Sequence, residues 1–420
     1  MKGKGSALLL ALTLALAAPA AYAGNGHNLH GVGAVNSAMG GAGVALPNDA
    51  LGALLLNPAL LTGLDGSRFE FSAEYNTQKN AVESKAGPFS GRTEDDSDPA
   101  LIPAFGWTRH KSGSRLAIGM GFLGLAGFGA DYPQDSTNPI LAPQPQGFGR
   151  VYSNYQLMKV PFVVAWKVND SFSVGASLNT ARSALTAEPA GFASPDCSGP
   201  AGPCFFPHVN ADSAWGFGLG VGAYYKVNPA FALGLSYNTE TDFSDFEWNS
   251  AVSNPNLPTF GRGRKIKFQL NAPAVLVGGL AFTPNDRLAI AVDGKWINYE
   301  NTEGFKDTLG FKDITVFDAG VQWRATDKVT LRGGYNRGEN PIPDELTFIN
   351  VAVPAIFEDR VAAGFGMRVN ESLELNAAYY HVFENRITGP FLGPTGPVPG
   401  TSVTTEMTMD SIVLTFSFNL

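Results

Sequence analysis

Histidine and cysteine pairs are the first residues in this sequence whose spacing could support chemistry. His27 and His30 form an HxxH pair, a spacing that can place two imidazoles on one metal ion. Their segment is rich in glycine and has no nearby carboxylate to complete such a site. Cys197 and Cys204 are the two cysteines of the chain, and they lie among glycines and prolines in PDCSGPAGPCFFP. Two thiols without a second ligand pair do not indicate a metal site, so no metal is expected.

A glycine motif is the other candidate for chemistry. GMGFLG, residues 119–124, fits GxGxxG, but no helix follows it and no acidic residue stands about 20 positions later. Glycine within a strand more often marks a bulge or a bend. The sequence contains no Walker loop, HExxH or GxSxG motif, and its Ser, His and Asp residues are scattered. We therefore expect no catalytic residue, no cofactor and no enzyme activity, with a membrane-barrel esterase or lipase as the alternative.

The N-terminus has the three parts of a secretory signal peptide. Two lysines precede the apolar run ALLLALTLALAAPAAYA, which ends in small residues. We predict a signal peptide over residues 1–23, cleaved after Ala23, with an N-terminal anchor helix as the alternative. Export brings the cysteines into an oxidising compartment, so Cys197 and Cys204 are expected to form a disulfide within one loop.

Composition points to strands that cross a membrane. The net charge is −8, and no block of lysines or arginines suggests a nucleic-acid surface. Charged residues make up only 16% of the chain, although no later segment is apolar enough to form a membrane helix. Apolar residues at every second position, together with 49 glycines, are typical of a membrane β-barrel.

The elements that must position any site are therefore strands. In RFEFSAEY, for example, Phe69 and Phe71 share one face, whereas Glu70 and Ser72 share the other. Short turns alternate with long loops along the chain, beginning with a loop expected near residues 79–98. Counting the segments gives fourteen strands, and an even number suits a bacterial barrel. A soluble multi-domain β protein is the alternative.

One apolar segment does not fit the strand pattern. NDALGALLLNPALLTGL, residues 48–64, indicates one or two short helices. Within it, Asn57 suits an N-cap, Pro58 the first helical position and Gly63 a C-terminal cap. Because a fourteen-stranded barrel would otherwise enclose a channel, we expect residues 24–67 to fill its lumen as a hatch and residues 68–420 to form the barrel.

The N-terminal block resembles that of the FadL/TodX family of outer-membrane transporters. The similarity rests on the run SAMGGAGVA, the pair Asp49-Ala50 and the triplet Asn57-Pro58-Ala59 before the first strand. Late segments such as VTLRGGYNRGENPIP are also similar. The resemblance implies passive uptake of long-chain fatty acids or aromatic hydrocarbons. It further implies capture by extracellular loops, a pocket beside the hatch and lateral exit near a kinked third strand.

The sequence departs from the family in two places. The chain ends in Leu420, where outer-membrane barrels usually end in an aromatic residue, although Phe418 lies two residues earlier on the same face. The charged lumen residues that meet the fatty-acid carboxylate have no clear counterpart. Arg182 is the nearest candidate for ligand binding, and a neutral aromatic ligand remains open.

Two further groups of residues are assigned to the ligand route. Gly119, Gly121, Gly124 and Gly127, flanked by Pro103 and Pro161 in the neighbouring strands, are expected to form a lateral opening. The alternative is that these glycines make room for the hatch. The second group lies in the long loop near residues 125–149 and is expected to form a ligand entrance groove, or else to pack the loop onto the barrel mouth: Leu125, Phe128, Tyr132, Ile140, Leu141 and Phe148.

Together these observations predict an all-β outer-membrane protein of a Gram-negative bacterium with both termini in the periplasm. The expected partners are a hydrophobic small molecule, outer-membrane lipid and lipopolysaccharide, and a monomer is expected. A structural or adhesive barrel is the alternative function, and a hatch argues against a general porin.

Overall fold

The computed structural model describes residues 25–199, 202–393 and 395–420 of the chain. The predicted signal peptide, residues 1–23, lies outside the described residues. Within these ranges, no helix is both long and apolar enough to span a bilayer.

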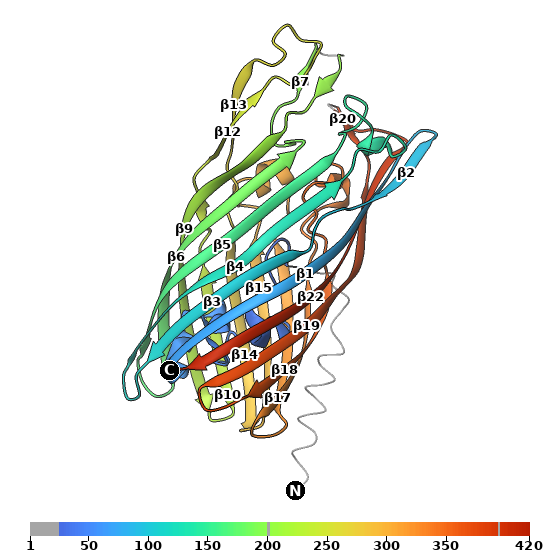
Figure 1. Cartoon of the computed structure of the whole chain (residues 1–420). Helices are drawn as coiled ribbons and strands as arrows, with labels where there is room; N and C mark the ends of the chain where they lie inside the picture. Colours follow the sequence, from blue (N-terminus) through green and yellow to red (C-terminus); the bar gives the residue numbers. More distant parts are fainter. Residues whose placement is uncertain (1–24, 200–201, 394) are drawn as a thin grey trace.

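A closed antiparallel barrel makes up most of the molecule (Figure 1). Its sheet has sixteen strands, of which β2 (Phe89–Glu94) and β11 (Asp242–Phe243) are short additions, so fourteen form the wall. The ring closes because β10 pairs with both β9 and β14 and β1 pairs with both β3 and β22. The wall strands, in chain order around the ring, are β1 (Gly66–Ala86), β3 (Ala100–His110), β4 (Leu116–Tyr132), β5 (Val151–Lys167), β6 (Phe172–Glu188), β9 (Val209–Asn228), β10 (Phe231–Asn238), β14 (Ala274–Asn285), β15 (Leu288–Asn298), β16 (Ile314–Arg324), β17 (Val329–Gly338), β18 (Asp359–Arg368), β19 (Leu373–Gly389) and β22 (Thr401–Asn419). The predicted fold class is confirmed.

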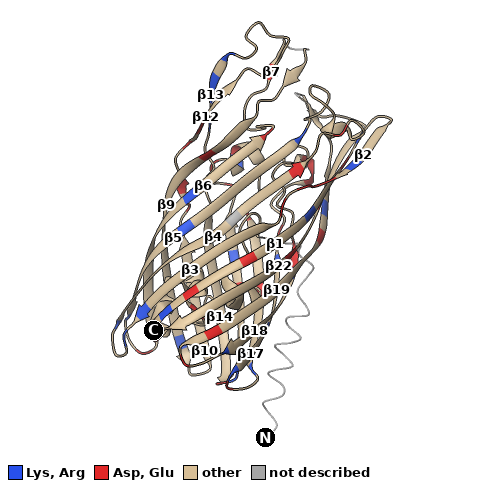
Figure 2. Ribbon diagram, in the orientation of Figure 1, with Lys and Arg blue, Asp and Glu red and all other residues tan. Residues whose placement is uncertain are grey.

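The wall is apolar on the outside and polar or small on the inside. In β1 the exposed side chains include Phe71 and Tyr75, whereas Glu70 and Glu74 are buried in the interior. Uncharged positions make up most of the strand length in Figure 2. This arrangement, the reverse of a soluble protein, suits a wall that faces lipid.

Short turns and long loops lie at opposite ends of the barrel. The turns after β5, β16 and β18 have only a few residues, whereas the other end carries extra hairpins that project beyond the wall (Figure 1). The expected loop at residues 79–98 is wrong in part, because β1 continues to Ala86 and pairs with β2. Its alternation extends the ladder past the barrel rim. The other elements of the long-loop end are β7 (Asp196–Cys197), β8 (Cys204–Phe205), β12 (Phe246–Ala251), β13 (Gly263–Phe268), β20 (Leu392–Gly393), β21 (Gly396–Pro397), η2 (Pro139–Leu141), η3 (Phe305–Leu309) and η4 (Asp344–Leu346).

In its described residues, from Asn25 onward, the hatch contains three short helices, α2 (Gly33–Ala38), α3 (Ala50–Leu56) and η1 (Pro58–Gly63). Asp49 caps α3 by accepting the N–H of Gly52, and Asn57 caps η1 by accepting the N–H of Ala59. Pro58 begins η1, where its missing N–H costs no hydrogen bond. The hatch ends where β1 begins at Gly66.

The hatch is buried inside the barrel, in the half nearer the short turns (Figure 1). Its leucines, such as Leu51, Leu60 and Leu61, are at most 1% exposed, and each buried leucine contributes about 1.5–3 kcal/mol. Hydrogen bonds tie it to strands around the ring. Their wall partners are Glu70 in β1, Ser173 in β6, Ala223 in β9, Asp293 in β15, Arg360 in β18 and Thr415 in β22.

Candidate functional site

An aromatic cluster lies between the start of the hatch and the long loops. The His27 imidazole centroid is 4.6 Å from Phe128, 5.7 Å from Phe305 and 5.3 Å from Phe311. Tyr155 stacks on Phe128 at 4.9 Å. All five side chains are buried or nearly so, because β4, β5 and the loop after β15 each contribute at least one ring. The cluster is therefore an apolar region next to the hatch.

His27 is held as a neutral ring in this cluster. Burial lowers the pKa of His27 to about 3, so its imidazole carries no charge near neutral pH. The backbone N–H of His27 donates to the Tyr299 hydroxyl at 3.2 Å, and that hydroxyl donates to the Asn25 carbonyl at 3.3 Å. The first described residues of the chain are thus anchored to the aromatic cluster.

The wall between β3 and β4 is incomplete beside this cluster. Pairing of the two strands ends at Ala104 and Leu123, although β4 continues to Tyr132 against β5 alone. The register of β4 against β5 shifts between Gly124 and Ala126, which leaves Leu125 as an extra residue. After a bulge of this kind, side chains that would have pointed into the barrel point outward, and the reverse. Accordingly, the buried residues of β4 are odd-numbered below the bulge (Ala117, Gly119, Gly121 and Leu123) and even-numbered above it (Phe128, Ala130 and Tyr132), with Gly124 also buried at the bulge itself.

The start of the hatch is bonded directly to this bulge. The N–H of Leu29 donates to the Leu125 carbonyl at 2.7 Å, and the N–H of Gly127 donates to the His27 carbonyl at 3.3 Å. One of these bonds is made by the extra residue itself and the other by Gly127, at a level where β3 no longer pairs with β4. The hatch, the aromatic cluster and the break in the wall therefore form one continuous structure.

A buried cation lies close to the same break. Lys159 of β5 pairs with Leu123 of β4 and is only 9% exposed. Its Nζ donates to the Asn238 side-chain oxygen at 3.4 Å, and among the described residues it makes no ion pair. The sequence analysis missed Lys159. Alternation places Lys159 on the same face as Tyr155 and Leu157, but it does not show that this face is the interior.

The four predicted opening glycines divide into two pairs. Gly119 and Gly121 lie in the regular β3–β4 ladder, and a Cβ there would come within 2.8 Å of Leu61 and 3.1 Å of Leu54. These two glycines make room for the hatch. Gly124 lies at the register shift, and Gly127 pairs with β5 only. Pro103 ends the β3 residues that have no partner in β4, whereas Pro161 stays within the paired β5–β6 ladder.

The predicted entrance-groove residues do not form one open surface. Phe128 belongs to the aromatic cluster, and Leu125 packs partly buried against it. Tyr132, Ile140 and Leu141 are instead at most 1% exposed in a separate cluster under the loops, with Phe148 packed against them. In this conformation these side chains pack the loop onto the barrel mouth.

Arg182 does not face the lumen. The buried residues of β6 are odd-numbered, and Arg182 is exposed on the outer face opposite Trp215. A side chain with this facing does not reach a ligand inside the barrel, so its position gives the expected binding role no support. Alternation shows which residues share a face, not which face is inside.

The Asn57-Pro58-Ala59 triplet anchors the hatch. The Asn57 amide donates to the carbonyls of Val44 and of Ala223 in β9, both at 2.9 Å. A Cβ on Gly222 of β9 would come within 2.0 Å of the Asn57 side chain, so glycine is needed for this close contact.

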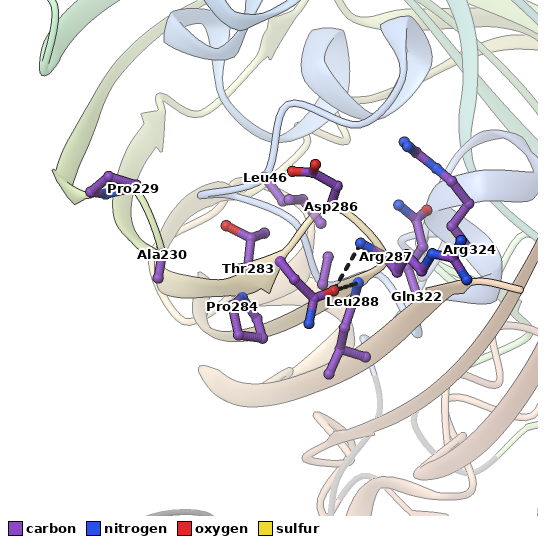
Figure 3. A pocket seen from close by; sticks show the side chains of 12 residues that line it. Leu46, Pro229, Ala230, Thr283, Pro284, Asp286, Arg287, Leu288, Gln322 and Arg324 are labelled. Atoms are coloured by element: carbon purple, nitrogen blue, oxygen red, sulfur yellow. Dashed lines mark hydrogen bonds between the residues drawn. The ribbon is translucent and has the colours of Figure 1, made fainter. Parts of the chain in front are cut away.

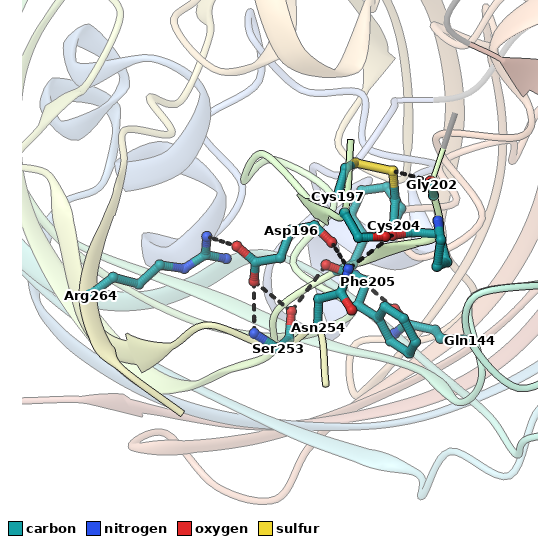
Figure 4. The surroundings of a disulfide bond; sticks show 12 residues. Gln144, Asp196, Cys197, Gly202, Cys204, Phe205, Ser253, Asn254 and Arg264 are labelled. Atoms are coloured by element: carbon teal, nitrogen blue, oxygen red, sulfur yellow. Dashed lines mark hydrogen bonds and ion pairs between the residues drawn. A yellow bond between two sulfur atoms is a disulfide. The ribbon is translucent and has the colours of Figure 1, made fainter. Parts of the chain in front are cut away.

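A disulfide joins Cys197 and Cys204 across the β7–β8 hairpin (Figure 4). The neighbouring Asp196 accepts hydrogen bonds from Arg264 and Ser253, each at 2.7 Å, which connect this hairpin to the β12–β13 hairpin.

His27 and His30 are both buried in the lumen, and the described residues contain no group of three or more potential metal ligands.

Comparisons with known proteins agree with this architecture. A family model described as outer membrane protein transport protein (OMPP1/FadL/TodX) matches residues 11–420. The structure of the toluene transporter TodX from P. putida has a TM-score of 0.67 at 19% identity, covering 93% of this chain and 99% of that one. A Pseudomonas aeruginosa FadL homologue has a TM-score of 0.72 at 16% identity, covering 94% and 99%. The Ralstonia pickettii toluene transporter TbuX has a TM-score of 0.67 at 19% identity, covering 93% and 99%. A search of curated proteins found no match.

Proposed function

The chain belongs to the OMPP1/FadL/TodX family of outer-membrane transport proteins, and from this premise we propose that it takes up long-chain fatty acids by passive diffusion. The family consists of transport channels for hydrophobic compounds in the outer membrane of Gram-negative bacteria. The short turns therefore face the periplasm and the long loops face the exterior. Both ends of the barrel chain, at Gly66 and Asn419, lie on the periplasmic side.

The proposed route begins at the loops, passes the aromatic cluster beside the hatch and leaves through the wall between β3 and β4. The proposed route rests on one observation: the start of the hatch is hydrogen-bonded to the bulge where β3–β4 pairing ends. Movement of residues 27–29 would therefore open the cluster and the wall together. Lateral release is favourable for an apolar compound, since each CH₂ kept out of water is worth about 0.8 kcal/mol.

The burial of Lys159 without an ion-pair partner favours a ligand that carries a carboxylate. A buried cation without an ion-pair partner carries a desolvation cost that an anionic ligand would offset. Its position opposite Leu123, below the bulge, places it beside the proposed exit. A fatty acid would meet Lys159 with its head group while its chain lies along apolar side chains.

A neutral aromatic hydrocarbon is the second candidate ligand. The rings of Phe128, Tyr155, Phe305 and Phe311 around the neutral His27 favour it. We also propose that the protein is a monomer whose outer wall contacts outer-membrane lipid and lipopolysaccharide.

Identification of the compound that co-purifies with the protein tests this proposal. The protein would be extracted from outer membranes, and the bound compound would be identified by mass spectrometry after denaturation. We expect long-chain fatty acids at near-stoichiometric amounts. Recovery of neutral aromatic compounds from cells grown with toluene would favour the second candidate. Absence of any apolar compound under both conditions would favour a structural or adhesive barrel.

A further inference from the structure

A cavity lies at the periplasmic mouth of the lumen, away from the proposed uptake route. It has a volume of about 370 Å³ and lies between the hatch and the periplasmic ends of β14, β15 and β16 (Figure 3). Leu46 of the hatch forms one wall, and Arg287, Gln322 and Arg324 line another. A cavity of this volume is large enough for a small organic molecule.

Arg287 and Arg324 both line this cavity and lie opposite each other across the β15–β16 pair. The backbone N–H of Arg324 donates to the Arg287 carbonyl at 2.8 Å, so the two residues continue the register that pairs Leu288 with Trp323. Arg324 lies on the same inward face of β16 as the buried Asp318. Like charges directly opposite each other in an antiparallel pair are destabilising. An anion between them would remove that repulsion.

The protein itself does not neutralise this pair. Within the described ranges, neither guanidinium forms an ion pair or a side-chain hydrogen bond. Asp286 also lines the cavity, and among the described residues it forms no ion pair with either arginine. A carboxylate fits two guanidinium groups particularly well, because it can accept parallel N–H hydrogen bonds.

Part of the remaining cavity wall is apolar. Leu46, Pro229, Ala230 and Ala289 contribute aliphatic surface. Inorganic phosphate would leave this surface exposed to water, whereas a carboxylate with a short hydrocarbon body would cover it. Gln322 connects the cavity to the hatch, since its Oε1 accepts the Asn48 amide N–H at 2.9 Å. An occupant would therefore contact both the wall and the hatch.

We propose that this periplasmic cavity is a binding site for a small organic carboxylate, held by Arg287 and Arg324. The head group lies between the two guanidinium groups, and the hydrocarbon body lies against Leu46. The occupant would join the hatch to the β15–β16 end of the wall from the periplasmic side. The site is separate from Lys159 and from the aromatic cluster, so it does not depend on the ligand that is taken up.

Calorimetric titration of the purified full-length protein with hexanoate tests this site. We expect saturable binding that weakens about tenfold in Arg287→Gln and in Arg324→Gln, since each removes one charge-assisted contact. Arg368→Gln changes another exposed arginine near a periplasmic turn and is the matched control, with no expected effect. Because hexanoate can also meet Lys159 in the uptake route, the same titrations are repeated in the Lys159→Met background, where the weakening by Arg287→Gln and Arg324→Gln should persist.

Three results would overturn the proposal. The first is the absence of saturable hexanoate binding to a folded wild-type protein. The second is equal weakening in Arg368→Gln, which would indicate a general effect of surface charge. The third is inorganic phosphate binding as tightly as hexanoate, which would show a simple anion site without a role for the apolar wall. Heat-modifiable gel mobility would confirm that each variant is folded.

Discussion

Lys159 and Arg182 show that the face of a strand on which a side chain lies decides whether it can reach a ligand in the lumen. Both are cations in neighbouring wall strands, but Lys159 lies buried in the lumen and Arg182 is exposed outside. The sequence predicts which residues of a strand share a face, because that depends only on the period of two. It does not by itself predict which of the two faces is the interior of the barrel. The candidate ligand residue could therefore be recognised only from the fold.

Substitution of Lys159 by methionine should separate the two candidate ligands. Lys159→Met keeps the length of the side chain but removes the charge, so we expect fatty-acid affinity to fall about tenfold. Toluene binding should not change, because it has no charge to meet. Fluorescence displacement with the purified protein would measure both affinities.

The conservative variant provides the control for that experiment. Lys159→Arg retains a cation at the same position and should keep most of the fatty-acid affinity. Equal affinities of wild type and Lys159→Met for a fatty acid would remove Lys159 from the ligand site.

The elements of the fold were largely predictable, and the exceptions have physical reasons. The strand count and the hatch followed from alternation, turn residues and a short apolar segment ending at Gly63. The bulge at Leu125 was not located, because several glycines in one strand do not reveal which of them interrupts the register. The hairpins of the long loops were missed because short strands that pair only with each other carry little periodic signal.

Removal of the hatch should open the barrel. The hatch helices bury their leucines against the inner wall, and a fourteen-stranded wall is too wide for its own side chains to fill. Deletion of residues 25–64 should therefore increase single-channel conductance in planar bilayers severalfold. An unchanged conductance in a folded deletion variant would show that the loops, rather than the hatch, close the lumen.

The whole molecule combines a lipid-facing wall, a polar lumen and a hatch attached to both. Exposed apolar side chains such as Leu233 and Leu235 cover the outside, and buried polar groups such as Asp293 bind the hatch inside. The wall is interrupted where β3 and β4 separate, beside the start of the hatch. This arrangement fits the proposed passage of a hydrophobic compound from the exterior to the membrane without entry into the periplasm.

Deletion of Leu125 tests this central claim most directly. Removing the extra residue restores continuous alternation in β4 and allows β3 and β4 to pair further. Uptake of radiolabelled oleate would be measured in cells whose only transporter of this kind is the wild-type protein, the deletion variant or Leu125→Ala. Leu125→Ala retains the bulge and is the matched control. We predict that uptake falls to background in the deletion variant alone, while the purified variant still binds oleate. A folded deletion variant that imports oleate at the wild-type rate would contradict lateral exit between β3 and β4.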